Sequence, residues 1–415
     1  MINQPNANYI YRTSNIPELR NLVVEIAPKG EGLKVRVAGI SSPWIRFFIK
    51  RFLLSHTSLG ALEKRSGANI YSIYLPPMPS LAHQRMFESV ISTLIYKRPV
   101  PLAATIGITG QCQYSCKHCS ASGRDPKRSD MSYKEIRRVI DECLALGVSN
   151  ITFTGGEPLL NKDITRLIAS VPGELAVTQV FTNAATLSSS MIAELKSAGL
   201  YGLQISLDSA DPIEHDQMRG FKGAFAAVGE GAREAREKGL LVGISTFATR
   251  DRIERGFLPD LASLVQSWGV SEITVFDAIE TGSLREKNEF LIDKISRRRL
   301  IADMKIINRR YRNKLRVVTQ SWTNSGQSFS RFIGCLAAKF QIHITAQGDL
   351  TPCDFTPLSF GNIRESSVGE LWHGLTSHPA YQWQALTCRM QNPGFRKQYI
   401  DTIPEGTYIP YRINC

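Results

Sequence analysis

Short runs of β-branched and other apolar residues alternate with helical stretches between residues 102 and 280. Each run ends at a glycine or a polar residue, and this pattern predicts β-strands. The predicted strands are AATIGIT (103–109), VSNITFT (148–154), VTQVFTN (177–183), GLQISLD (202–208), LVGISTF (241–247) and EITVFDA (272–278). Amphipathic helices separate them. Successive βα units form a parallel sheet with helices outside it and with loops available for chemistry at the carboxyl ends of the strands.

The helices of this region carry start and stop signals. Ser132 and Glu135 form a capping box ahead of the helix YKEIRRVIDECLAL, and Gly147 follows its end. Gly199, Gly239 and Gly269 stand where later helices should stop, in positions that tolerate a left-handed backbone. Together with the strand pattern, these signals predict an α/β fold in which six βα units form a parallel sheet with helices outside it, as in (βα) barrels.

The segments on either side of the barrel have different patterns. Upstream, residues 22–39 predict a hairpin, residues 41–54 a short basic and aromatic helix, and residues 80–98 another helix. Downstream, residues 292–316 predict a long basic helix, which a strand and a second hairpin over 341–355 follow. We therefore expect four regions, namely an N-terminal α+β accessory unit (1–100), the partial barrel (101–285), a basic helix with a connecting strand (286–330) and a C-terminal extension (331–415).

Composition places the chain among globular proteins. Of its 415 residues, 43% are hydrophobic and 21% are charged, and no apolar run reaches the roughly 20 residues that span a bilayer. The first residues, MINQPNANYIYRTSNIPELR, lack the basic and then apolar blocks of a secretory signal. A cytoplasmic location is the resulting expectation.

The formal net charge of +13 would suit an anionic partner such as a nucleic acid, a membrane surface or an acidic peptide. Two basic segments, WIRFFIKRF (44–52) and the helix over 292–316, are candidates for contact with phosphates or a membrane interface. Each segment also fits a solvated or packed helix face. Peripheral membrane contact therefore remains open at this point.

Eight cysteines are too few for a disulfide scaffold in a chain of this length, and clustered cysteines favour metal binding. Cys112, Cys116 and Cys119 lie within eight positions, in the loop after the first predicted strand. Structural zinc is usually closed by four ligands, so a CxxxCxxC triplet fits it poorly. A [4Fe-4S] cluster held by three thiolates would leave one iron open to a substrate. Cys143 lies on the apolar side of a helix and is expected in the core.

The CxxxCxxC spacing after the first strand of six βα units resembles the hallmark of the radical S-adenosylmethionine (SAM) superfamily, and the resemblance covers about residues 102 to 282. It implies that the six units form a partial (βα)6 barrel similar to part of a TIM barrel. It also implies that the three cysteines hold a [4Fe-4S] cluster whose open iron SAM chelates. One electron from the cluster would cleave SAM to methionine and a 5′-deoxyadenosyl radical. His118 fills the position before the third cysteine, where the family usually has an aromatic residue near the adenine.

The second predicted strand runs into TGGEPLL, with Gly155, Gly156 and Glu157. Two glycines allow a close backbone approach to a ligand, and carbonyls with a carboxylate can accept hydrogen bonds from an ammonium group. The segment resembles the GGEP motif with which the family holds the methionine amino group of SAM. The motif lies one βα unit after the cysteine loop, which makes the resemblance specific.

Polar residues end the third and fourth predicted strands. In related enzymes such residues contact the ribose and the carboxylate of SAM. By position, the resemblance assigns Asn183, Ser206 and Asp208 to this shell and adds Arg219 as a weaker candidate. Helix or turn capping is the alternative role for Ser206 and Asp208. His215 is expected to be a structural surface histidine.

A second group of cysteines lies in the C-terminal region. Cys335 precedes Gly348, which leads to Cys353 in a G-x4-C arrangement that resembles the SPASM or twitch extension of radical SAM maturases. Such extensions bind auxiliary [4Fe-4S] clusters, which are usually held by four cysteines. Cys388 and Cys415 are the remaining downstream candidates, although Cys415 is the last residue. The dense CxxCxxxxxCxxxC group of the full extension is missing. We therefore expect at most one auxiliary cluster, with four cysteine ligands or with one open iron.

The sequence thus predicts a radical SAM enzyme that abstracts hydrogen from a substrate and takes its electron from a donor such as flavodoxin or ferredoxin. The extension favours a peptide or protein substrate by analogy, whereas a small molecule or lipid is the alternative. The N-terminal hairpin and helices are a candidate peptide-recognition unit. A non-catalytic iron-sulfur sensor that binds nucleic acid is the competing class, and the SAM-shell residues speak against it. The oligomeric state stays open.

Overall fold

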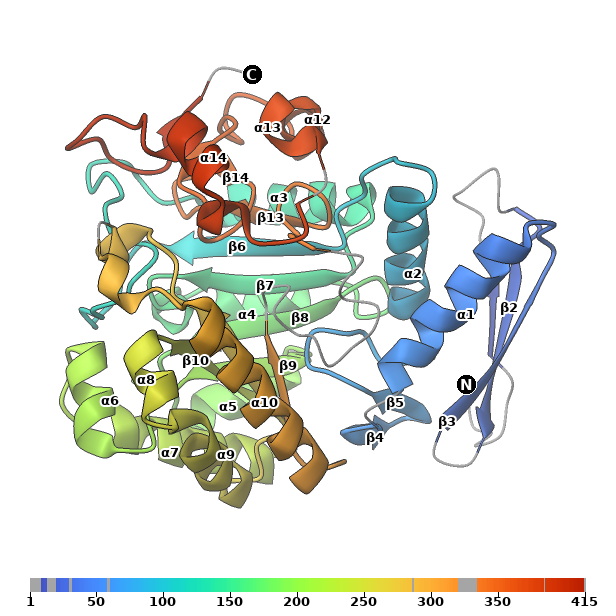
Figure 1. Ribbon diagram of the computed structural model, residues 1–415, viewed down its shortest axis with the longest axis horizontal. Coiled ribbons are helices and arrows are strands. Elements are labelled where there is room, and N and C mark those ends of the chain that lie inside the picture. The colour runs from blue at the N-terminus through green and yellow to red at the C-terminus, as the bar shows by residue number, and fades with distance from the viewer. Residues whose placement is uncertain are drawn as a thin grey trace.

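The computed structural model describes residues 9–12, 20–29, 32–57, 60–285, 287–319, 334–383 and 385–413. Its centre is a nine-stranded sheet in the order β12-β11-β10-β9-β8-β7-β6-β13-β14 (Figure 1). The strands are β6 Ala103–Thr109, β7 Asn150–Gly155, β8 Val177–Thr182, β9 Gly202–Ser206, β10 Leu241–Ala248, β11 Glu272–Asp277, β12 Arg316–Thr319, β13 Gln341–Ile344 and β14 Leu350–Thr351. The strands from β6 to β11 are parallel in chain order, which confirms the α/β fold of the partial-barrel type.

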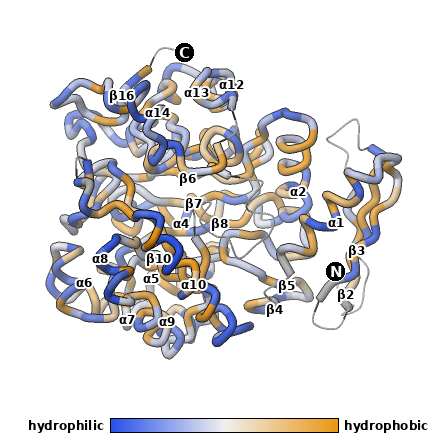
Figure 2. Tube along the Cα trace, in the orientation of Figure 1, coloured by the Kyte–Doolittle hydropathy of each residue, from blue (hydrophilic) through white to orange (hydrophobic). Residues whose placement is uncertain are grey.

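Helices cover the outer face of this sheet. They are α3 Tyr133–Leu146, α4 Ile164–Ala169, α5 Ser189–Ser197, α6 Pro212–Arg219, α7 Ala224–Glu237, α8 Arg250–Glu254, α9 Phe257–Ser267 and α10 Lys294–Arg310. The predicted capping box is present, because Ser132 Oγ accepts from Glu135 N and the Glu135 carboxylate accepts from Ser132 N. Gly147 ends α3 with φ 107°, a left-handed conformation that favours glycine. Figure 2 shows hydrophobic positions along the central strands and polar ones along much of α10.

Two edges of the sheet extend beyond the six predicted strands. β12 pairs in parallel with β11, and β13 pairs in parallel with β6. β13 and β14 form the predicted C-terminal hairpin, so the extension continues the sheet of the barrel. Its other elements are β15 Leu358–Ser359, which pairs with β16 Tyr411–Arg412, and the helices α12 Val368–Ser377, α13 Pro379–Gln382 and α14 Pro393–Phe395.

The N-terminal region forms a second, smaller layer. An antiparallel sheet of β1 Tyr9–Arg12, β2 Val23–Lys29 and β3 Gly32–Ala38 packs with α1 Pro43–Thr57 and α2 Leu81–Leu94 around a separate hydrophobic core. A short hairpin, β4 Glu63–Arg65 with β5 Ala68–Ile70, joins them. The sequence predicts the β2–β3 hairpin and both helices, but it does not predict β1, β4 and β5.

Residues 60–75 close the amino end of the barrel. Ser72 Oγ donates to Glu272 at 3.0 Å, Asn150 Nδ2 donates to Tyr74 O at 2.9 Å, and the Tyr201 hydroxyl donates to Leu75 O at 2.9 Å. Each barrel partner stands at or next to the first residue of its strand. The N-terminal region therefore lies at the end of the barrel opposite to the loops that follow the strands. The arrowheads of β6 and β7 point away from it in Figure 1.

Among the helices of the described residues, none is both long and apolar enough to cross a membrane.

We predict that Glu272 makes the stability of the protein depend on pH. Its side chain is fully buried, and burial raises the pKa of its carboxyl from 4.5 to about 7, although Arg316 and Ser72 oppose the rise. The folded protein therefore favours the protonated Glu272 carboxyl. The resulting contribution to the free energy of unfolding is fully present below about pH 4.5 and is lost as the pH rises through about 7.

Glu272→Gln keeps an acceptor for Ser72 and cannot ionise. We expect it to raise the free energy of unfolding by roughly 2 to 3 kcal/mol at pH 8 and to change it little at pH 5. Thermal unfolding across this pH range measures the effect, with the same substitution at exposed Glu254 as the control. An equal increase in the free energy of unfolding at pH 5 and pH 8 would contradict the raised pKa of Glu272.

Candidate active site and auxiliary cysteine site

The three-cysteine loop lies at the carboxyl end of β6, where the sequence predicts it. Cys119 N donates to Cys116 O at 3.3 Å, and Ser283 N, from the segment after β11, donates to Cys119 O at 2.9 Å. Cys112 is exposed, whereas Cys116 and Cys119 are partly buried. The loop is thus bonded to the segment after β11 across the barrel mouth, and Cys112 is the most exposed of its three cysteines.

Two side chains direct N–H groups at these thiols. Asn183 Nδ2 lies 3.8 Å from Cys112 Sγ, and Arg219 Nη1 lies 3.9 Å from Cys116 Sγ. Burial raises the pKa of both thiols, and these donors oppose the rise. Hydrogen bonds of this kind stabilise a thiolate, which is the form that binds iron.

The donor set fits an iron-sulfur cluster better than a single ion. No three of the described cysteine, histidine or carboxylate side chains converge on one metal position. A cubane cluster binds each thiolate at a different iron and so needs more widely spaced sulfurs. The cysteines of the loop are free thiols. The three thiols, with two N–H donors beside them, therefore suit the cluster that the sequence predicts.

The glycines of the GGEP segment bring the end of β7 against the cysteine loop. Gly156 N donates to Thr109 O and Glu157 N donates to Gln111 O, both at 2.7 Å. A Cβ atom at Gly156 would lie 2.1 Å from Gln111 O, so only glycine fits this contact. The sequence predicts that these glycines let a ligand come close to the backbone. In the structure they instead let the backbone of the segment that carries Cys112 come close.

Glu157 is buried and has partners within the chain. Its carboxylate accepts from Thr182 Oγ1 and Asn183 N, both at 2.7 Å, and from Leu159 N at 3.1 Å. These bonds connect the ends of β7 and β8 and fix Asn183, whose amide lies beside Cys112. The predicted bond from an ammonium group to this carboxylate therefore has to compete with three existing donors.

Asp208, Arg219 and His118 form a buried group beside Cys116. Arg219 Nε lies 2.7 Å from Asp208 Oδ2, and His118 Nε2 lies 3.6 Å from the same oxygen. Burial alone would raise the pKa of Asp208, but Arg219, His118 and Arg252 outweigh it and lower the pKa to about 2. Burial lowers the pKa of His118 to about 4. Asp208 is thus an anion whose charge an adjacent arginine balances.

His118 stacks on Phe247 at the end of β10, with ring centroids 4.0 Å apart. Arg252, from α8, donates to Phe247 O and lies near Asp208. The sequence analysis missed both residues, although Phe247 ends the fifth predicted strand and so stands where site residues are expected. Ser206 lies one strand away, with its hydroxyl 3.3 Å from that of Ser245.

The expectation for His215 is wrong in one respect. The residue is fully buried, and its Nδ1 accepts a hydrogen bond from Asp208 N at 3.1 Å. It does not lie on the surface but contacts the backbone of the buried group, which fits the structural role that the sequence suggests. Cys143 is fully buried in the main core, as predicted.

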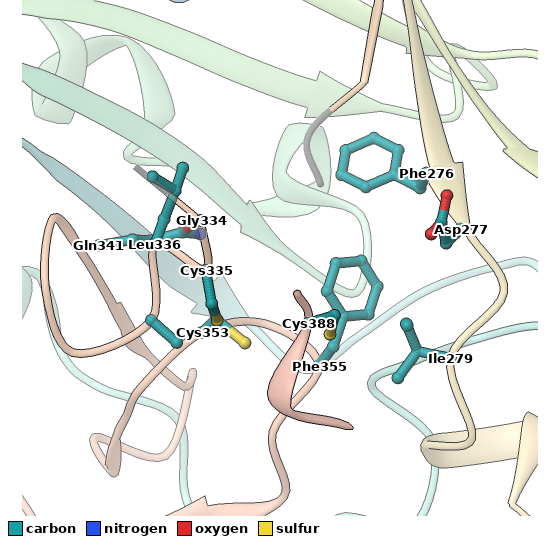
Figure 3. Close-up of a pocket in the computed structure, with 11 residues that line it drawn as sticks. Phe276, Asp277, Ile279, Gly334, Cys335, Leu336, Gln341, Cys353, Phe355 and Cys388 are labelled. Atoms are coloured by element: carbon teal, nitrogen blue, oxygen red, sulfur yellow. The ribbon is translucent and has the colours of Figure 1, made fainter. Parts of the chain in front are cut away.

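The C-terminal cysteines come together at a cavity of about 70 Å³ (Figure 3). Cys335 precedes β13, Cys353 follows β14, and Cys388 comes from the segment before α14. All three line the same cavity with the apolar side chains of Phe276, Ile279, Leu336, Ala337 and Phe355. Cys415 lies outside the described residues.

The three thiols of this cavity form a soft donor set of the kind that holds an iron-sulfur cluster, and burial in an apolar space keeps them protonated when no metal is bound. Burial raises the pKa of Cys353 to about 12 and that of Cys388 well above its usual range. Thr356 Oγ1 lies 3.2 Å from Cys353 Sγ. In Figure 3, Asp277 lies across the cavity from Cys335 and Cys353, and Arg297 Nη1 holds its Oδ2 at 3.0 Å. Three soft ligands thus face an apolar space with one carboxylate at its rim.

Comparison with known proteins identifies the class of enzyme to which this protein is similar. Residues 106–249 match the radical SAM superfamily model, and residues 335–397 match the model of the SPASM iron-sulfur cluster-binding domain. The chain thus contains a radical SAM domain followed by a SPASM-type domain. It is a radical SAM enzyme, whose chemistry uses a [4Fe-4S] cluster and SAM.

Individual relatives cover most of the chain at low identity. The PqqA peptide cyclase of Xanthomonas campestris pv. campestris is 25% identical over 66% of this chain and 74% of that protein. The AdoMet-dependent heme synthase of Oleidesulfovibrio alaskensis is 25% identical over 64% and 72%. SuiB of Streptococcus suis, solved with bound SAM, superimposes with a TM-score of 0.56 at 20% identity over 72% and 71%, and it has also been solved with its precursor peptide SuiA.

We predict that the contact between the GGEP segment and the cysteine loop requires a glycine at position 156. Gly156→Ala places a methyl group against Gln111 O and should displace the loop. We expect SAM binding by the reconstituted protein to weaken at least tenfold, measured by calorimetry.

Gly173→Ala is the matched control, because a Cβ atom at Gly173 meets no atom within 4 Å. Equal SAM affinity for the two variants would show that the contact does not position the site.

Proposed function

We propose that this radical SAM enzyme modifies a peptide or protein by abstracting a hydrogen atom from it. The observation that carries the proposal is that one barrel with its C-terminal extension carries two separate sets of three cysteines. One set follows β6, and the other lines the cavity beside the end of β11. The PqqA peptide cyclase and the SuiB complex with SuiA give the analogy for a peptide substrate.

We assign the radical-generating cluster to Cys112, Cys116 and Cys119. When bound and reduced, this cluster supplies the electron that cleaves SAM to methionine and a 5′-deoxyadenosyl radical. Asn183 and Arg219 stabilise the thiolates through the contacts described above. Asp208 balances the charge of Arg219 and keeps it in place.

The remaining shell residues orient SAM. The GGEP backbone, through Gly155 and Gly156, offers carbonyls to the amino group, and Glu157 fixes the position of Asn183. His118 and Phe247 form an aromatic surface for the adenine, and Ser206 contributes a hydroxyl at the end of β9. Residues in these roles would hold SAM at the mouth of the barrel and orient it for cleavage.

We assign one auxiliary cluster to Cys335, Cys353 and Cys388, with Cys415 as a further candidate ligand. The apolar lining of their cavity favours such a cluster because it limits solvent access. An electron donor such as flavodoxin or ferredoxin, and a cytoplasmic location, complete the proposal.

A small-molecule substrate is the second candidate. The heme synthase covers nearly the same share of the chain as the peptide cyclase at the same identity. The nature of the substrate therefore needs its own test.

We predict that anaerobically reconstituted protein with a strong reductant converts SAM to 5′-deoxyadenosine, measured by chromatography. The variant with Cys112, Cys116 and Cys119 all changed to Ala should form none above background, because it cannot hold the cluster. Cys143→Ala is the matched control and should keep the activity, since Cys143 is buried in the core away from both sites. Product from the triple variant would contradict the assignment.

The same assay separates the two substrate classes. A size-fractionated cell extract that stimulates 5′-deoxyadenosine formation should lose this effect after protease treatment if the substrate is a peptide. A protease-resistant stimulus of low molecular mass would favour the small-molecule candidate and overturn the peptide proposal.

For the auxiliary site, we predict that changing Cys335 and Cys353 to Ala lowers the iron content of the reconstituted protein by about four atoms per chain. SAM binding should persist, because the first site is intact. Cys415→Ala, measured beside it, tests the fourth ligand. Unchanged iron in the double variant would show that the cavity holds no cluster.

A further inference from the structure

Helix α1 exposes large apolar side chains to solvent. Trp44 and Phe47 are 61% and 64% exposed, and Leu54 is 39% exposed. Phe47 lies three residues after Trp44 and seven before Leu54, so the three side chains share one face of the helix. The opposite face, with Ile49 and Phe52, is buried in the core that α1 shares with the N-terminal sheet. Folding thus leaves an apolar surface uncovered.

The same face of α1 is basic. Arg46, Lys50 and Arg51 are all exposed, and α1 contains no acidic residue. None of the three forms an ion pair with another described residue. Lys50 and Arg51 follow Phe47 by three and four residues and therefore flank it on the helix surface. We call the six residues Trp44, Arg46, Phe47, Lys50, Arg51 and Leu54 the α1 face.

The α1 face lies far from the three-cysteine loop that follows β6. Its helix belongs to the unit that closes the amino end of the barrel, whereas this loop follows the carboxyl end of β6. A strand of six to eight residues spans roughly 20 to 25 Å. Figure 1 shows α1 at the opposite end of the molecule from the arrowheads of β6 and β7. A partner bound at α1 would therefore leave the barrel mouth open.

The chemistry of the α1 face matches a bilayer surface. Tryptophan, phenylalanine and leucine enter the boundary between headgroups and acyl chains, and flanking lysine and arginine reach the lipid phosphates. Anionic lipids add an attraction for each basic residue. The side chains project outward from a helix, which suits a flat apolar layer better than it suits an acidic peptide, whose side chains would need a groove. We propose that α1 docks the protein reversibly on anionic membranes.

Vesicle co-sedimentation of the full-length reconstituted protein tests this proposal. We expect binding to phosphatidylcholine vesicles that contain phosphatidylglycerol and much weaker binding to phosphatidylcholine alone. Trp44→Ser with Phe47→Ser should lower the partition coefficient roughly tenfold or more. Lys50→Gln with Arg51→Gln should lower it roughly 5-fold for each charge, and added salt should weaken the wild-type binding.

The control removes exposed apolar area elsewhere. Ile295 and Ile306 on α10 are 77% and 62% exposed, and changing both to Ser should leave vesicle binding unchanged. All variants should keep 5′-deoxyadenosine formation and thermal stability, because the exchanged side chains lie on the surface. Absence of wild-type binding, or equal binding by the α1 variants, would overturn the proposal. Loss of peptide modification without any lipid binding would show that the α1 face serves a peptide instead.

Discussion

The parallel pairing of β13 with β6 is the interaction on which the arrangement of the site depends. Gln341 to Ile344 pair with Ala103 to Ile106, and Phe340 O accepts from Leu102 N and Ala103 N. β6 leads directly into the three-cysteine loop, while β13 lies between Cys335 and Cys353. One backbone ladder thus sets the position of the auxiliary site relative to the site of radical formation.

Side chains and close backbone contacts reinforce this ladder. A Cβ atom at Gly107 would lie 2.7 Å from Ala346 N, so the turn after β13 can approach β6 only because residue 107 is glycine. Arg128, in the segment after the cysteine loop, forms two hydrogen bonds with Asp349 at 2.7 and 3.1 Å. Asp130 accepts from Gly110 N and Gln347 Nε2. A partly exposed ion pair contributes only about 1 kcal/mol or less, so these contacts fix geometry more than they add stability.

Local sequence signals were sufficient to predict the parallel strands, because each predicted strand carries its own apolar run. The spacing of Cys112, Cys116 and Cys119, together with the family resemblance, predicts the first site, and the structure puts these cysteines in the loop after β6 as expected. The ladder between β13 and β6 joins segments more than two hundred positions apart and leaves no local signal. Likewise, the partners of Glu157 come from the neighbouring strand, and the burial of His215 depends on how α6 packs. Such features depend on contacts between residues far apart in the chain, and the pattern of a single sequence does not predict these contacts.

We propose two distinct iron-sulfur sites, one at the cysteine loop after β6 and one at the cavity of Cys335, Cys353 and Cys388, and we propose that only the first binds SAM. Electron paramagnetic resonance of the reduced, reconstituted protein, with and without SAM, tests this most directly. We predict two cluster signals, and SAM should shift only the one that is lost when Cys112, Cys116 and Cys119 are changed to Ala. A shift by SAM of the signal that survives in that variant would contradict the account.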